Sequence, residues 1–99
     1  MKETARVFQA LADPTRRQIL QELKGGDLAA GEIASRFPIS GPAVSRHLSI
    51  LEVAGLVNER REGNRIIYSL CADALANCLN DFMSAVCPTQ IAYRRRRRA

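Results

Sequence analysis

The sequence predicts a mainly α-helical fold with one β-hairpin, in the order α-α-α-α-β-β-α, on three grounds. Apolar residues recur at helical spacing in four segments before Gly55. After Gly55 the apolar residues alternate instead, around Gly63-Asn64, a residue pair that suits a two-residue hairpin loop. Helical spacing then returns over residues 73 to 86 and ends before Pro88.

The first two predicted helices are short and amphipathic. The first spans residues 3 to 12, and the second begins at Pro14 behind Asp13, which is placed to cap it. The second ends at Gly25-Gly26, because glycine tolerates the backbone of a helix exit. The apolar faces of these two helices consist of Val7, Phe8, Leu11, Ile19, Leu20 and Leu23.

Two further helices follow, joined by a tight turn. Residues 28 to 37 predict a helix of about two turns that Pro38 stops. Ser40 is the N-cap candidate for a stronger helix from Gly41 to Ala54. At 100° per residue the inward face of this helix consists of Val44, Leu48 and Leu51. Its outward positions are small or polar, mostly in the N-terminal half.

The chain is 99 residues long, which predicts one domain, over residues 1–88. Its net charge is +5, from 15 Lys and Arg against 10 Asp and Glu. The run Arg94 to Arg98 holds five of those 15, so the rest of the chain has 10 against 10 and is neutral overall. We expect residues 89–99 to form a disordered basic tail that adds sequence-independent affinity for phosphates or serves only solubility.

Cysteine usage and hydropathy predict a cytoplasmic protein that does not enter membranes. The cysteines are odd in number, the N-terminus carries no apolar secretory segment, and no apolar run approaches the ~20 residues that span a bilayer. The cysteines, Cys71, Cys78 and Cys87, are candidate redox or thiol sensors. For Cys78, which shares an apolar stripe with Leu75 and Phe82, a small buried hydrophobe is the favoured interpretation. No cofactor is predicted, and no nucleophile, base and orienter occur together as an enzyme would require.

The fourth helix and the hairpin together indicate nucleic-acid binding. Ser45 and Arg46 lie on the outward face, where an arginine can donate two hydrogen bonds to guanine in a major groove. Backbone amides at Ser40 and Gly41 suit a phosphate. The hairpin strands add Arg60, Arg61 and Arg65. Helix, turn, helix and basic hairpin describe a winged helix-turn-helix, although each of these polar faces could also be merely solvated.

Three segments closely resemble the ArsR/SmtB family of winged helix-turn-helix repressors. They are "ALADPTRRQIL", "AGEIASRFPISGPAVSRHLSILEVAGLV" and "RREGNRIIYSL", and the resemblance covers roughly residues 5 to 86. Family members often bind metals through cysteines on the third helix or through histidines on the last helix. Here the third helix has no thiol and the last no histidine. The chain therefore resembles the autorepressor-like branch without a metal site.

The resemblance implies a homodimeric transcriptional repressor that binds an inverted-repeat operator in double-stranded DNA. It places Ser40, Ser45, Arg46 and His47 on the recognition helix and Arg60, Arg61, Asn64 and Arg65 on the wing. His47 lies about 60° from the packing direction, so a half-buried flanking histidine is the alternative. We expect Arg16 and Arg17 to pair with a glutamate, of which Glu22, Glu32 and Glu52 are the candidates, rather than with phosphate.

The apolar stripe of the last helix suits either a core contact within the chain or a dimer seam with the first helix. Its apolar width exceeds what a small body needs, so we expect it to serve partly as each. The expected seam consists of Val7, Phe8, Leu11, Leu75, Cys78, Leu79, Phe82 and Val86. The alternative function is a winged-helix module without its own operator, whose last helix docks another protein. The effector, if there is one, is not identified by the sequence.

Overall fold

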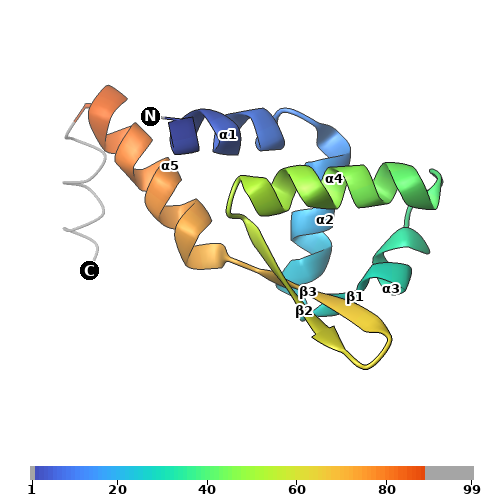
Figure 1. Ribbon diagram of the computed structural model, residues 1–99. Helices are drawn as coiled ribbons and strands as arrows, with labels where there is room; N and C mark the ends of the chain where they lie inside the picture. The colour runs from blue at the N-terminus through green and yellow to red at the C-terminus, as the bar shows by residue number, and fades with distance from the viewer. Residues whose placement is uncertain (1, 89–99) are drawn as a thin grey trace.

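Five helices and a three-stranded antiparallel sheet make up residues 2–88, the part of the chain that this computed structural model describes (Figure 1). The elements are α1 (Lys2–Leu11), α2 (Pro14–Lys24), β1 (Leu28–Ala29), α3 (Ala30–Ala34), α4 (Gly41–Val53), β2 (Val57–Glu62), β3 (Arg65–Leu70) and α5 (Ala72–Val86). The mainly α fold with a β-hairpin wing is confirmed, and one strand is added to the predicted order.

The helices begin where the capping residues predict. The Asp13 carboxylate accepts a hydrogen bond from the backbone N–H of Arg16 at 3.1 Å, which starts α2 with Pro14 in its first turn. The Ser40 hydroxyl accepts one from the N–H of Ala43 at 3.2 Å and starts α4. Gly55, with φ of 78°, follows the end of α4, because a left-handed backbone there is cheap only for glycine.

The predicted helix over residues 28 to 37 is wrong in its bounds. Leu28 and Ala29 instead form β1, which pairs antiparallel with Tyr68 and Ile67 of β3, and α3 covers only five residues. The side chain of Glu32 accepts a hydrogen bond from the Ala29 N–H at 2.9 Å. The helix therefore starts two residues later than its apolar pattern suggests, since the preceding residues are held by the sheet.

The core lies where α2, α3 and α4 meet the base of the hairpin. Its fully buried side chains are Ile19, Ile33, Val44, Leu48, Leu51, Leu56 and Val57. This places the inward face of α4 as the helical wheel predicts. In contrast, α5 has no buried residue, and it extends away from this core beside the N-terminal end of α1 (Figure 1).

Candidate nucleic-acid interface

The N-terminal half of α4 presents an exposed polar face next to the turn from α3. Ser45 and Arg46 are both exposed, and within residues 2–88 the Arg46 guanidinium forms no hydrogen bond or ion pair. Gly41 is exposed at the start of the helix. The Ser40 hydroxyl accepts from its own helix and can still donate its proton to a phosphate. These groups can reach a duplex without breaking any contact of the folded chain.

His47 faces the body of the protein and not the open side of α4. Its side chain is 21% exposed, and its Nδ1 lies 3.3 Å from Nη1 of Arg16 and 3.9 Å from Oδ2 of Asp13. The Arg16 backbone N–H, followed by the charge of His47, holds the pKa of Asp13 below its usual range. The structure therefore places His47 in the flanking position that the helical wheel left open.

Arg16 and Arg17 hold the end of α1, so the expected pairing with a glutamate is wrong. Arg16 donates to the carbonyls of Ala10 at 2.8 Å and Gln9 at 3.0 Å, and Arg17 donates to that of Leu11 at 2.7 Å. The last carbonyls of a helix lack intrahelical hydrogen-bond donors and carry partial negative charge. An arginine there supplies the missing donors and a compensating positive charge. The position of these arginines just beyond a predicted helix end is the signal that could have indicated this.

The wing arginines differ sharply in their surroundings. Arg60 is held by the carboxylates of Asp27 at 2.7 Å and Glu62 at 2.8 Å. Arg65 donates to Glu32 at 2.9 Å. Arg61 forms no hydrogen bond or ion pair within the described part of the chain. Asn64 is exposed in the hairpin turn beside Gly63, whose φ of 63° makes this turn possible.

The expected dimer residues lie on α1 and α5, but with unequal exposure. Phe8 and Phe82 stack edge to face with ring centroids 5.0 Å apart. Phe82 and Val86 are 47% and 65% exposed, whereas Val7 is buried in the core and has little surface left for a partner. The remaining seam residues are half-buried: Leu11, Leu75, Cys78 and Leu79. An apolar strip therefore continues from α1 onto the open side of α5.

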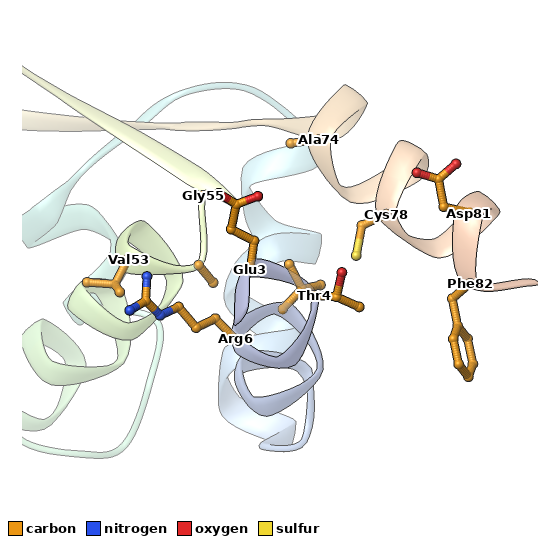
Figure 2. Close-up of a pocket in the computed structure, with 11 residues that line it drawn as sticks. Glu3, Thr4, Arg6, Val53, Gly55, Ala74, Cys78, Asp81 and Phe82 are labelled. Carbon is orange, nitrogen blue, oxygen red and sulfur yellow. The ribbon is translucent and has the colours of Figure 1, made fainter. Parts of the chain in front are cut away.

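A groove of about 620 Å³ separates the N-terminal end of α1 from α5 and the end of α4 (Figure 2). Cys78 points from α5 into this groove toward Thr4, and Phe82 lines its outer end. Cys71 and Cys87 are the caps at the two ends of α5. Successive thiols are therefore at least about 10 Å apart along the helix axis, so no two of them can form a disulfide within one chain while α5 is intact.

None of the helices within residues 2–88 is long and apolar enough to cross a membrane. In the same residues no three side chains of His, Cys, Asp or Glu gather in a way that could hold a metal ion.

A short helix, a turn, an exposed second helix and a hairpin wing define a winged helix-turn-helix, the fold of a large class of DNA-binding proteins. Comparison with known proteins gives the family. Residues 13–59 match the model of "Bacterial regulatory protein, arsR family". The chain is 50% identical over 74 residues to the transcriptional repressor SdpR of Bacillus subtilis, covering 75% of this chain and 82% of the relative. It is 49% identical over 76 residues to the HTH-type transcriptional regulator Rv2034 of Mycobacterium tuberculosis, covering 77% and 71%.

Solved structures of similar proteins support the same family. An ArsR-like transcriptional regulator from Rhodococcus sp. RHA1 superposes with a TM-score of 0.77 at 34% identity, over 96% of this chain and 86% of the other. The homodimeric winged helix-turn-helix DNA-binding domain of Mb0332 from Mycobacterium bovis gives 0.71 at 33% identity, over 93% and 84%. The chain belongs to the arsR family of bacterial regulatory proteins and is a DNA-binding transcriptional repressor, not an enzyme.

Proposed function

We propose that this repressor binds an inverted-repeat operator with one α4 of the homodimer in each of two major grooves. The observation that supports the proposal is Arg46, which is exposed beside Ser45 in the N-terminal half of α4 and has no hydrogen-bond or ion-pair partner within residues 2–88. A helix in the major groove reads base edges, and a dimer places two such helices about one duplex turn apart, roughly 34 Å. Because it acts on bacterial DNA, the protein would work in the cytoplasm.

Within this proposal the DNA-binding residues divide into three roles. Ser45 and Arg46 contact base edges, Ser40 and Gly41 contact phosphate, and His47 positions α4 against the turn between α1 and α2. The wing contributes Arg61 and Asn64 directly, whereas Arg60 and Arg65 are already engaged by carboxylates. The wing residues together are Arg60, Arg61, Asn64 and Arg65.

The experiment is a selection of genomic fragments by the purified full chain, followed by affinity measurements on the enriched duplex and a scrambled duplex. We expect one inverted repeat to be enriched and Arg46→Ala to lose operator affinity selectively, since a good arginine contact to guanine gives about 1–3 kcal/mol of discrimination. Lys24→Ala, which removes one exposed positive charge at the end of α2, is the matched control. Flat enrichment would instead favour a protein-interaction module.

We propose residues 1–88 as the DNA-binding and dimerisation domain and residues 89–99 as an auxiliary basic segment. The run Arg94 to Arg98 lies outside the described residues, so the proposal rests on its charge alone. Arginines without a fixed base contact attach to the phosphates of any sequence. Deleting the run should lower operator and random-duplex affinity by the same factor, and a selective loss for the operator contradicts this role.

We propose Cys78 as the thiol through which an oxidant or thiol reagent would act on this repressor. The groove next to it separates α1 from α5, so an adduct on the Cys78 sulfur would push apart the two helices that form the seam. Treatment with peroxide should lower operator affinity in the wild type and leave Cys78→Ser unaffected, with Cys71→Ser and Cys87→Ser as controls. Unchanged operator binding of the wild type under peroxide, reductant and thiophilic metals excludes thiol sensing.

A further inference from the structure

One face of the wing hairpin is occupied by a network of charges. Successive side chains of β2 point to opposite faces of the strand. One face carries Asn58, Arg60 and Glu62, and the other carries Glu59 and Arg61. The register places Glu62 directly across from Arg65 of β3, and residues directly opposite share a face. Arg60 and Arg65 are thus on the same face, and Arg61 is on the other.

The guanidinium of Arg60 is surrounded by acceptors from three segments. Its Nη1 donates to Asp27 Oδ2 at 2.7 Å and to Ser69 Oγ at 3.1 Å, and its Nε donates to Glu62 Oε2 at 2.8 Å. The hydrogen bonds from Arg60 hold the pKa of Asp27 below its usual range, and those to Asp27 and Glu62 raise the pKa of Arg60. The positive charge of Arg60 therefore already has its counterions within the protein.

Arg65 is held by a carboxylate that is itself fixed. Oε1 of Glu32 accepts the Arg65 Nη2–H at 2.9 Å and also the backbone N–H of Ala29 at 2.9 Å. The hydrogen bond from the Ala29 N–H fixes the Glu32 carboxylate at the start of α3, and the same oxygen accepts from Arg65 of the wing. The pair with Arg65 thus holds the wing against α3.

These pairs contribute little to folding. The side chains of Arg60 and Asp27 are 48% and 46% exposed, and ion pairs this exposed to water add little to stability. Their larger consequence is for DNA, because a phosphate that binds Arg60 or Arg65 must first replace a carboxylate. No such competition exists for Arg61, which has no partner among residues 2–88.

We propose that Asp27 and Glu32 are specificity-determining residues that hold Arg60 and Arg65 on the protein and so lower its affinity for DNA of arbitrary sequence. This inference rests on the proposed function, in which the wing lies beside the duplex. On the operator the base contacts of α4 fix the docking geometry, whereas on other sequences the dimer binds wherever most arginines reach phosphates. Restraining two arginines per subunit therefore costs more affinity on other sequences than on the operator. Operator preference therefore increases at the expense of total affinity.

The test measures the dissociation constants of full-chain variants for the selected operator duplex and for a scrambled duplex of the same length, across salt concentrations. Glu32→Gln keeps an acceptor for the Ala29 N–H but loses the charge that holds Arg65. Asp27→Asn combined with Glu62→Gln removes both charges that hold Arg60. Asp73→Asn is the matched control, because Asp73 is exposed on α5 and forms no ion pair within the described residues. Circular dichroism checks that each variant remains folded.

We expect each wing variant to steepen the salt dependence on the scrambled duplex. Freeing one arginine per subunit adds two phosphate contacts per dimer, and the slope of log K against log salt changes by about 0.9 per contact. The affinity lost between about 50 and 200 mM salt should therefore grow by a further factor of about ten. The ratio of operator to scrambled affinity should fall, and Asp73→Asn should change neither quantity.

Removing the freed arginine should reverse the effect. Glu32→Gln combined with Arg65→Gln is expected to restore the wild-type salt slope, and so is Arg60→Gln added to the Asp27→Asn, Glu62→Gln pair. The proposal is overturned if the wing variants match Asp73→Asn, if operator and scrambled affinities rise by the same factor, or if a folded variant binds both duplexes more weakly. A wild type without operator preference defeats the proposed function instead, while the slope on the scrambled duplex still tests the restraint.

Discussion

Nη1 of Arg16 lies 3.3 Å from Nδ1 of His47, which joins α4 to the first turn of α2. Arg16 also donates to the carbonyls of Gln9 and Ala10. One guanidinium therefore connects α4, which reads DNA in our proposal, with α1, which carries part of the expected dimer seam.

His47→Ala should destabilise the fold by about 1–2 kcal/mol, because it removes a half-buried ring and an acceptor for Arg16. Operator and scrambled affinities should fall together, since no base contact is lost. Urea unfolding at fixed protomer concentration and the two dissociation constants check this. Arg46→Ala is the comparison, with the opposite result: unchanged stability and a selective loss for the operator. A selective loss in His47→Ala at unchanged stability would assign His47 to base contact.

Ser40 combines two roles that can be separated by substitution. Ser40→Ala removes the acceptor of the Ala43 N–H and should cost about 1 kcal/mol of stability, as N-cap losses typically do. Ser40→Asp keeps an acceptor at this position but places a negative charge where a phosphate would bind. We expect Ser40→Asp to unfold like the wild type and to bind both duplexes weakly. Thermal melts and binding on the same samples measure both effects, and wild-type affinity in Ser40→Asp would remove Ser40 from the interface.

Local signals in the sequence predict most of the fold. Asp13 and Ser40 cap their helices with their own side chains, and Gly63 makes the hairpin turn through its own backbone, so the starts of α2 and α4 and the hairpin were predicted correctly. The two-residue strand β1 could not be predicted, because Leu28 and Ala29 are too few to show a period and are defined only by pairing with β3.

In the candidate site too, local features could be predicted from the sequence and contacts between distant segments could not. Exposure of Arg46 follows from the helical wheel of one element, whereas the partners of the wing arginines come from distant segments. Asp27 lies 33 positions before Arg60, and Glu32 lies 33 positions before Arg65. Only the packing of the wing against β1 and α3 brings these charges together. Sequence spacing thus indicated a basic wing and did not indicate that two of its three arginines are paired with carboxylates.

Tyr68 should make the protein sensitive to alkali. Burial, followed by the charge of Glu59 and the hydrogen bond that the phenol donates to it at 3.2 Å, raises the pKa of Tyr68 to about 12. The unfolded chain ionises at about 10, so the stabilisation by neutral Tyr68 is complete below pH 10 and is lost as the pH rises to 12. Two pH units correspond to at most about 3 kcal/mol.

Urea unfolding at pH 7, 10 and 11.5, at fixed protomer concentration, measures this loss. Tyr68→Phe should flatten the alkaline decline and remove the late step from a tyrosine absorbance titration. Tyr93→Phe, which removes the other tyrosine of the chain, is the matched control and should keep both features. An alkaline decline of equal size in Tyr68→Phe would mean that other groups cause it.

The dimer seam is tested best at Phe82, because its ring stacks on Phe8 and yet remains 47% exposed. An aromatic side chain with one covered edge and one open face is well placed to be a hot spot, where truncation costs 2 kcal/mol or more. Phe82→Ala should therefore raise the dimer dissociation constant by on the order of 30-fold or more, and Phe82→Glu should give folded monomers. Sedimentation velocity across a range of concentrations measures both effects.

The control for the seam is Ile39→Ala, which removes an equally exposed apolar side chain from the turn between α3 and α4. It should leave the dimer intact. A monomeric Phe82→Glu should also bind a single half-site as well as the full inverted repeat, because the linkage between two recognition helices is what makes the repeat preferred. If Phe82→Glu remains a dimer at every concentration, the seam does not run through the open side of α5, and the apolar strip from Phe8 to Val86 requires another occupant.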